Sequence, residues 1–481
     1  MNSTQIAAIE QVNLFNPDGT PAVQVATGHL AKYLLIPSNL VGFHNVRTDK
    51  MVESSGASVY CHLGEFPFSS SDKVCDQCGA QMHINNHSNV ELWHLPHGDV
   101  HSRLYFSVVQ MRCPICGRTH MQDIPFKADG HRITKELEAY ICKLLEDGTH
   151  TNKSIARMTG VNQAIVKDID IARLKEKYTV DGKTLKKPER QARYLAIDEF
   201  KLHNGHRFAT HIIDLETGHI LWLAKGKKKQ VVYDFIKFVG MSWMKGVIAI
   251  ACDMNADFER AFREKCPHLR TVFDRFHIVK NFNEKVVNEI RKDEIKRLEA
   301  EGNFEALKKL KHSKYILYAK VETLKKNDMK AGSIRRKGSE LFGTDTQRRK
   351  GGYEMRALDL KLENELFFDV EIVRDMLDDA YIQRDENAMR EVVERMSNYC
   401  KHTRNSHFLW FAKLLDSHIE GIISHASIPI ASGKMEGINN KIKTLRRMCY
   451  GLPDDEYFFL KLLDMSRNGQ RNILRASSVR Y

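Results

Sequence analysis

The sequence predicts a multidomain α/β protein, and three observations lead to this fold class. The chain has 481 residues, which is too long for one ordinary domain. Two Cys-x-x-Cys pairs lie in a stretch rich in Cys, His and aromatic residues. Strand and helix patterns then alternate from residue 190 to 280, and several of the strand patterns end at an acidic residue.

Composition narrows the class of partner. The formal net charge is +13, which favours a polyanion and most simply nucleic acid, although a merely basic soluble protein stays an alternative. We find no run of 18 apolar residues and no signal-peptide pattern at the start. We therefore expect a cytoplasmic protein without a membrane partner.

Two near-identical turns predict a zinc module in residues 56–125. They are Cys75-Asp-Gln-Cys78-Gly and Cys113-Pro-Ile-Cys116-Gly. Four thiolates from two such turns form a closed tetrahedral site, so the expected role of Zn²⁺ is structural. The long interval must hold strands, of which Leu104–Met111 is one. Any of the histidines inside the interval could replace a thiolate: His83, His87, His94, His97 and His101.

Residues 131–180 predict three helices in a helix-turn-helix arrangement. The first spans Thr134–Leu145, the second Thr151–Thr159, and the third starts at Gln163 after a tight turn at Gly160. Asn162, Gln163 and Lys167 would face a DNA groove, since amides recognise adenine and lysine recognises guanine or phosphate. An ordinary three-helix bundle without DNA contacts is the alternative.

Residues 190–280 predict three strands, a helix, a strand, a helix and a strand. The ranges in that order are 193–200, 208–214, 219–224, 230–239, 247–252, 256–265 and 271–273. This is the order of a ribonuclease H-like fold, in which the first and fourth strands are neighbours. Asp198 and Asp253 would then lie side by side, and a third acid must come from a helix packed on the sheet.

Glu436 is the best candidate for that third acid. A helix from Met435 would have Met435, Ile438, Ile442, Leu445 and Cys449 on its apolar face. Its polar face would place Asn439, Asn440, Lys443 and Arg447 beside Glu436, where they suit DNA phosphates. A solvated charged face is the alternative. Glu199 would point to the other face of the sheet, and Asp257 could substitute as a ligand.

On these motifs the chain resembles DDE transposases of the ISL3 insertion-sequence group over nearly its full length. The resemblance covers the cysteine module, the helix-turn-helix, Ala-Ile-Asp198-Glu, Asp253, Asp274-Arg-Phe-His277 and Ser-Gly-Lys-Met-Glu436-Gly-Ile-Asn-Asn. It implies Asp198, Asp253 and Glu436 as the catalytic triad. It also implies Asp274 and His277 as an accessory signature, although His277 alone could be a structural residue.

The resemblance implies a function. Mg²⁺ or Mn²⁺ at the triad would support cleavage and strand transfer of double-stranded DNA, at element ends with terminal inverted repeats and at a target. A homodimer or larger synaptic complex is expected, in the prokaryotic cytoplasm and on the nucleoid. A catalytically silent DNA-binding regulator and another ribonuclease H-like nuclease, such as a junction resolvase, are the rivals.

The expected organisation has seven parts. They are an N-terminal segment (1–55), the zinc-binding module (56–125), the helix-turn-helix domain (131–180), the first part of the ribonuclease H-like core (190–280), a helical insertion (281–430), the second part of the core with the Glu436 helix (431–470) and a C-terminal tail (471–481).

Overall fold

The computed structural model describes residues 40–68, 73–203, 207–339, 343–430, 433–448 and 453–467, with backbone alone between 334 and 347. It forms two compact units. The first comprises Met1–Lys186 with Leu445–Tyr481, and the second comprises Lys187–Thr444. The predicted N-terminal segment up to residue 39 and the predicted tail lie outside the described residues.

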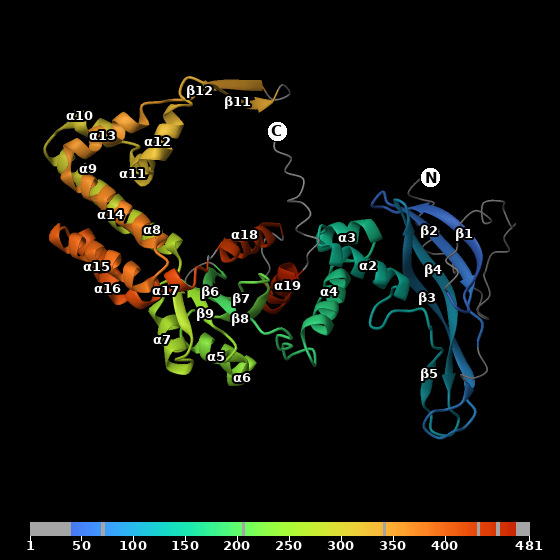
Figure 1. Cartoon of the computed structure of the whole chain (residues 1–481). Coiled ribbons are helices and arrows are strands. Elements are labelled where there is room, and N and C mark those ends of the chain that lie inside the picture. The colour runs from blue at the N-terminus through green and yellow to red at the C-terminus, as the bar shows by residue number, and fades with distance from the viewer. Residues whose placement is uncertain are drawn as a thin grey trace. The chain divides into compact units, whose positions relative to one another are not determined.

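A twisted sheet with a long β-hairpin dominates the first unit (Figure 1). The strands run in the order β1-β2-β4-β3, with β5 paired to β4, and only β2 and β4 are parallel. The sheet starts at His44, earlier than the module predicted from residue 56. The strands are β1 His44–Val52, β2 Ser58–Glu65, β3 His83–His97, β4 Val100–Arg112 and β5 Thr119–Met121.

Three capped helices follow, at the positions that the sequence predicts. They are α2 Lys135–Asp147, α3 Asn152–Thr159 and α4 Gln163–Tyr178. The side chains of Thr134, Thr151 and Asn162 accept hydrogen bonds from the first turns, which satisfies amides that a helix start leaves open. Apolar side chains of all three helices, among them Ile141, Ile155 and Val166, form one buried cluster.

One further helix, α19 Asp455–Arg467, belongs to the first unit and packs along α4. Charged groups are buried between these two helices: Asp170 is 0% exposed and Asp464 is 1% exposed. Because buried charges need partners, this contact depends on specific pairs rather than on apolar area alone.

The second unit contains a five-stranded sheet in the order β10-β9-β6-β7-β8 (Figure 1). Pairing is parallel between β6 and β9 and between β9 and β10, and antiparallel from β6 to β8. The predicted adjacency of the first and fourth strands is therefore confirmed. The strands are β6 Tyr194–Lys201, β7 Phe208–Asp214, β8 Ile220–Lys225, β9 Ala249–Cys252 and β10 Arg270–Phe273.

Helices connect these strands and bury their apolar side chains. The connections are α5 Gln230–Val239, α6 Met241–Met244 and α7 Ala256–Lys265. Val232 and Phe235 of α5 and Phe258 and Phe262 of α7 join the strand residues in one large core. The predicted bounds of α5 and α7 are confirmed to the residue.

Residues 275–427 are mainly helical; the sequence predicts a helical part over residues 281–430, and the helices start six residues earlier. The elements are α8 Arg275–Phe282, a π-helical turn Asn283–Val287, α9 Asn288–Ala300, α10 Phe304–Leu310, α11 Lys314–Tyr318, α12 Val321–Asp328, α13 Tyr353–Glu363, α14 Glu365–Ile382, α15 Glu386–His402, α16 Ser406–Ser417 and α17 Ile419–Ser427. A hairpin of β11 Ile334–Ser339 and β12 Gly343–Arg348 interrupts them, which the sequence did not predict. The basic run Arg335-Arg-Lys337 lies on β11, where the structure describes the backbone alone.

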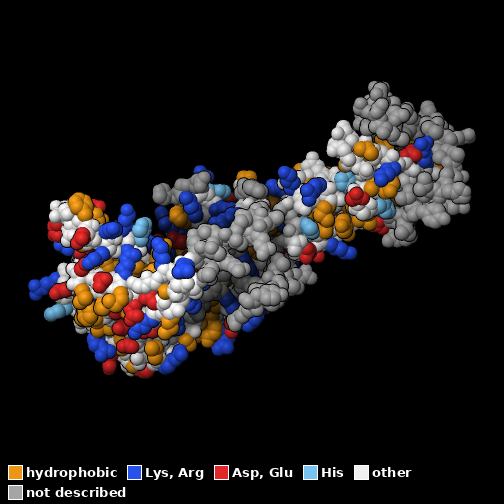
Figure 2. Space-filling model, turned by 90° about the horizontal axis from the view of Figure 1, so that it is seen from above, with side chains coloured by type: hydrophobic (Ala, Val, Ile, Leu, Met, Phe, Trp, Pro, Cys, Tyr) orange, Lys and Arg blue, Asp and Glu red, His pale blue; other side chains and the backbone are white. Residues whose placement is uncertain are grey.

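The last helix of the second unit, α18 Gly433–Met448, runs into the first unit at its final turn. Its buried residues are Met435, Ile438, Ile442 and Leu445, which confirms the predicted apolar face; Cys449 lies outside the described residues. No helix within the described ranges is long and apolar enough to cross a membrane. On the face seen in Figure 2, Lys and Arg side chains are interspersed with acidic and apolar ones.

Candidate functional site

Two carboxylates meet at one edge of the second sheet. Strands β6 and β9 are parallel neighbours, and Ile197 pairs with Cys252. Asp198 is the next residue on β6, and Asp253 directly follows β9. Because parallel strands end at the same edge, the fold brings together two acids that are 55 positions apart in the sequence.

Asp198 is tied to α18. The amide Nδ2 of Asn439 donates a hydrogen bond of 2.6 Å to Oδ2 of Asp198, and the backbone N of Glu199 donates to Oδ1 at 2.7 Å. Burial raises the pKa of the Asp198 carboxyl, and the charge of Asp253 adds to this, although the bond from Asn439 opposes it. The site therefore favours a cation beside Asp198.

Asp253 is paired with His277. Nδ1 of His277 lies 3.3 Å from Oδ1 of Asp253. Burial alone would raise the pKa of Asp253, but the hydrogen bond and charge of His277 outweigh it and the pKa is lowered. Burial would lower the pKa of His277, but Asp253 and Asp198 together raise it. Asp274 follows β10 and caps α8 by accepting from the backbone N of Phe276 at 3.0 Å, which sets the helix that carries His277.

Glu436 occupies the first turn of α18 and is exposed. It precedes Asn439 by three positions, so the two side chains are neighbours on one helix face. The Nζ of Lys434 donates to the backbone O of Glu216, which fixes the start of α18 to the turn after β7. Asn440 and Lys443 are exposed farther along α18, and Arg447 is exposed in its final turn.

The two alternative acids have other surroundings. Glu199 accepts a hydrogen bond from Nδ2 of Asn255 at 3.1 Å. Asp257 is exposed in the first turn of α7, where its backbone N donates to Oδ1 of Asn255 at 3.0 Å. Asn255 thus contacts the carboxylate of Glu199 and the backbone of Asp257 through its side-chain amide. Its position before a helix was the one sequence signal for this residue.

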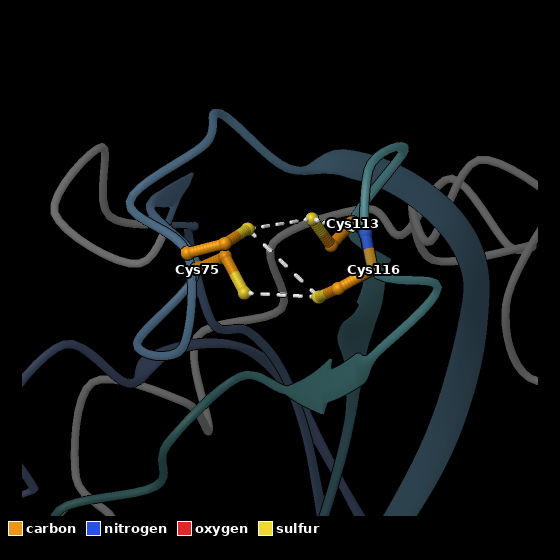
Figure 3. A group of neighbouring side chains, drawn as sticks. Cys75, Cys113 and Cys116 are labelled. Atoms are coloured by element: carbon orange, nitrogen blue, oxygen red, sulfur yellow. Dashed lines mark hydrogen bonds between the residues drawn. The ribbon is translucent and has the colours of Figure 1, made fainter.

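Four cysteines form a second site, in the first unit. The Sγ atoms of Cys75 and Cys116 are 3.6 Å apart, those of Cys78 and Cys113 are 3.4 Å apart, and those of Cys78 and Cys116 are 3.9 Å apart (Figure 3). A tetrahedral site with zinc–sulfur bonds of about 2.3 Å requires sulfurs about 3.8 Å apart. Across the described residues, this is the one group with three or more ligand atoms within 4.8 Å of one another, and it is able to hold a metal ion.

The two cysteine turns have the same backbone geometry. Gly79 and Gly117 adopt φ of 69° and 72°, and their amides donate to the carbonyls of Cys75 and Cys113 at 2.9 and 3.1 Å. Backbone amides of Gln77 and Cys78 lower the pKa of the Cys75 thiol. The amide of Cys116 lowers that of Cys113 to about 6, despite its burial. At Cys75 and Cys113 the turns therefore favour the thiolate, the form that binds metal. At Cys78 and Cys116 the amides of Ala80 and Arg118 would lower the pKa, but the neighbouring sulfurs and burial outweigh them and raise it.

The histidines within this interval do not replace a thiolate, because four sulfurs already converge. His83 and His87 lie at the start of β3, beside the cysteines, whereas His94, His97 and His101 lie near the opposite end of the β3–β4 hairpin.

Two of the three helix residues predicted to contact DNA are exposed. Asn162 caps α4 by accepting from the backbone N of Ala164 at 2.8 Å, and Gln163 is the first residue of α4. Lys167 is instead half-buried, since its Nζ lies 3.1 Å from Oδ2 of Asp454 and above the ring of Tyr457.

The chain matches a family model described as a transposase, that of the ISL3-type DDE transposases, over residues 195–462. That span is more than half of the chain and contains Asp198, Asp253 and Glu436. The chain belongs to the ISL3 family of DDE transposases.

Curated relatives agree with this family membership. A transposase for insertion sequence element IS1001 from Bordetella parapertussis is 24% identical over 391 residues, which cover 81% of this chain and 87% of the relative. A transposase for insertion sequence element IS1557 from Mycobacterium tuberculosis is 26% identical over 87 residues, which cover 18% of this chain and 20% of the relative. The IS1001 relative thus extends the similarity beyond the transposase span.

Proposed function

We propose that this family member binds the terminal inverted repeats of an insertion sequence, cleaves the DNA at the element ends and joins them to a target. The observation that carries the proposal is the juxtaposition of Asp198 and Asp253 at one sheet edge, with α18 bonded to Asp198 through Asn439. The strand order and the parallel pairing of β6 with β9 support a ribonuclease H-like core.

The metal ligands of this core would be Asp198, Asp253 and Glu436. The donor set fits Mg²⁺ or Mn²⁺, which prefer carboxylate oxygens, and a cation would relieve the burial and like charge that raise the pKa of Asp198. When bound, such ions lower the pKa of an attacking water or 3′-hydroxyl and stabilise the leaving oxygen.

The neighbours of these acids would position them. Asn439 fixes the orientation of the Asp198 carboxylate, and His277 does the same for Asp253. Both act as partners behind the ligands, the arrangement that typically aligns carboxylates in metal sites. This gives the accessory signature of Asp274 and His277 a physical role. Asp274 caps the N-terminus of α8, and α8 positions His277 beside Asp253.

DNA recognition would belong mainly to the first unit. The helices α2, α3 and α4 fit a helix-turn-helix domain, with Asn162 and Gln163 at the exposed start of the recognition helix. The four cysteines would hold a structural Zn²⁺. Asn440, Lys443 and Arg447 would bind phosphates near the triad. Since two element ends must be joined, a dimer or larger complex on DNA is the expected assembly.

Strand cleavage of a duplex that carries the cognate terminal repeat tests this function. With Mg²⁺, the wild-type chain should nick the repeat end, and Asp198→Asn, Asp253→Asn and Glu436→Gln should each lower the rate by at least about 100-fold. Asp234→Asn is the matched control, because Asp234 of α5 is exposed and belongs to no ligand set, proposed or alternative.

The outcomes separate the rivals. Sequence-specific binding without cleavage under any metal would identify a DNA-binding regulator. Cleavage of branched duplexes but not of repeat ends would identify another nuclease. Cleavage that survives all three substitutions would overturn the proposed ligand set.

A further inference from the structure

Four buried polar atoms without a hydrogen-bond partner lie at the end of the first sheet that is remote from the cysteines. They are the Nε2 atoms of His62, His94 and His97 and the Oε2 atom of Glu136. His62 is 2% exposed and His94 is 0% exposed. A buried polar atom without a partner costs free energy, so four in one region indicate that something binds there.

The sheet register places the histidines on one face. His62 of β2 and His94 of β3 both flank β4, opposite Leu104 and Ser102, which are two positions apart and share a face. Ser102 is fully buried, and its Oγ also has no hydrogen-bond partner among the described residues. Glu136 is in the first turn of α2, so the group joins the sheet to the first helix of the three-helix domain.

A threonine hydroxyl lies beside the second ring nitrogen, Nδ1, of both His62 and His94. Nδ1 of His62 lies 2.9 Å from the hydroxyl of Thr48, and Nδ1 of His94 lies 2.9 Å from the hydroxyl of Thr134. In the tautomer that carries its proton on Nδ1, each ring donates to its threonine and presents the lone pair of Nε2. This is the arrangement by which metal-binding histidines are oriented.

Two separations within this group, one in each of two pairs, are near those of a metal site. Two imidazoles that share a zinc ion, at zinc–nitrogen distances of about 2.1 Å, have ring centres about 5 Å apart and ligand atoms about 3.4 Å apart. The ring centres of His62 and His97 are 6.1 Å apart, and Nε2 of His94 lies 3.8 Å from Oε2 of Glu136. Closing each pair needs movements of about 1 Å or less. The two pairs must also approach each other when metal binds, since no three of these ligand atoms lie within 4.8 Å of one another.

We propose that His62, His94, His97 and Glu136 form a second metal site, selective for Zn²⁺, that fastens the sheet to α2. Three imidazoles and a carboxylate make a tetrahedral donor set that suits zinc. Burial, with the neighbouring imidazoles, lowers the pKa of His62 and His94 to about 4, which keeps both rings neutral and able to bind metal. Ordered water alone is the competing occupant.

Metal stoichiometry of the full-length chain tests the proposal. After dialysis against trace Zn²⁺, elemental analysis should find about two zinc ions per chain. The double variant Cys113→Ser/Cys116→Ser and the double variant His62→Gln/His97→Gln should each retain about one. His83→Gln is the matched control: it removes an exposed histidine of β3 and should leave the stoichiometry unchanged.

Cobalt spectroscopy keeps the test valid if the buried histidine variants fail to fold. In a variant with all four cysteines of the cluster (Cys75, Cys78, Cys113 and Cys116) changed to Ser, Co²⁺ should give the intense d–d bands of a tetrahedral nitrogen–oxygen site without thiolate charge transfer. Adding Glu136→Gln, a half-buried position, should weaken Co²⁺ binding by about 10-fold or more. A wild-type stoichiometry of about one that falls to about zero in the cysteine variant would overturn the second site, as would a cysteine variant that binds no Co²⁺.

Discussion

At the scale of single residues, Asn439 has the most informative position near the proposed metal site. Its Nδ2 donates to Asp198, while its Oδ1 is buried without a partner among the described residues. One amide thus orients a carboxylate and leaves an oxygen directed into the same region. This makes Asn439 a positioning residue rather than only a phosphate contact.

Asn439→Ala should therefore lower DNA cleavage by about 10- to 100-fold at saturating Mg²⁺, because Asp198 loses the donor that orients it. The apparent Mg²⁺ affinity should fall as well. Thr444→Ala, which changes an exposed residue of the same helix, is the control and should cleave at the wild-type rate. Single-turnover kinetics across a Mg²⁺ titration measure both effects. An Asn439→Ala chain with wild-type kinetics at every Mg²⁺ concentration would contradict the positioning role.

Sequence reasoning located Asp198, Asp253 and the four cysteines because each has a local signal: an acid at the end of an apolar run, or a repeated Cys-x-x-Cys-Gly turn. It could not find the bond between Asn439 and Asp198, since these residues are 241 positions apart. The pair of His277 and Asp253 was missed for the same reason, although the motif itself was noticed. Partners of this kind depend on the fold and have no spacing rule.

At the scale of elements, the contact between α4 and α19 depends on buried charge. Asp464 accepts from the hydroxyl of Tyr178 at 2.7 Å and lies 3.0 Å from Nζ of Lys177. Asp170 accepts from Nζ of Lys461 at 2.7 Å. Arg173 lies between the two carboxylates, 2.8 Å from Asp170 and 3.3 Å from Asp464.

Asp464→Ala should lower the free energy of unfolding of the first unit by about 3–5 kcal/mol, because the buried guanidinium of Arg173 and the buried hydroxyl of Tyr178 each lose a partner. Glu456→Ala is the control: it removes the exposed pair with Lys175 between the same helices and should cost at most about 1 kcal/mol. Denaturant unfolding measured by far-UV circular dichroism compares the two. Equal losses would show that the buried pairs add nothing specific.

The stability of the contact between α4 and α19 also depends on pH. Burial would raise the pKa of Asp464, but the bonds from Tyr178 and Lys177 outweigh it and lower the pKa below its ordinary 3.8. A lowered carboxyl pKa stabilises the fold above the ordinary value and loses that contribution as the pH falls through the folded value. The stability gap between wild type and Asp464→Ala should therefore be widest above about pH 4 and shrink below it.

A tight helix–strand contact gives a second test at this scale. A Cβ atom at Gly421 of α17 would overlap the ring of Phe273 on β10. Gly421→Ala should lower the free energy of unfolding of the second unit by about 1–3 kcal/mol. Thermal unfolding scans measure this loss. In the same scans Gly437→Ala, at a helical position with open space around it, should be neutral or slightly stabilising. A neutral Gly421→Ala would show that α17 moves away from β10 at little cost.

Most elements followed from the sequence because their periodicity is strong. Strand β7 and helices α5 and α7 match the predicted bounds, as apolar residues alternate or recur at helical spacing there. The hairpin of β11 and β12 was missed because its sequence, rich in Arg, Lys, Gly and Thr, has no alternation of apolar and polar residues. Strand β1 was missed for the same reason.

At the scale of the whole molecule, the net charge of +13 would attract DNA electrostatically before any specific contact forms. Binding to a repeat-bearing duplex should weaken by at least about 10-fold between about 50 and 200 mM salt, since bound phosphates release counterions. Fluorescence anisotropy across a salt series gives the slope of log affinity against log salt. Lys228→Ala, in the exposed basic run before α5, should reduce that slope by about 1. An affinity independent of salt would contradict phosphate binding.

The division into parts was predictable only in outline. The sequence predicts residues 431–470 as the second part of the ribonuclease H-like core, but the last helix of this range, α19, lies beside α4 in the first unit and not in the unit that contains β6 to β10. The apolar face of α19 predicts that this helix is buried, but it does not identify the surface on which the helix packs. The fold identifies that surface as α4, because Asp464 of α19 pairs with Arg173 of α4 and Asp170 of α4 pairs with Lys461 of α19.

The helical part between β10 and α18 begins and ends at the same strand. Helix α8 starts directly after β10, and α17 packs back on β10, where Arg270 donates to Ser424 at 3.0 Å. Because both ends of this helical segment lie at β10, its length does not affect the strands of the sheet. Evolution could lengthen, shorten or exchange it without shifting the register of the five-stranded sheet, and relatives that differ greatly in length here could keep the same carboxylate edge.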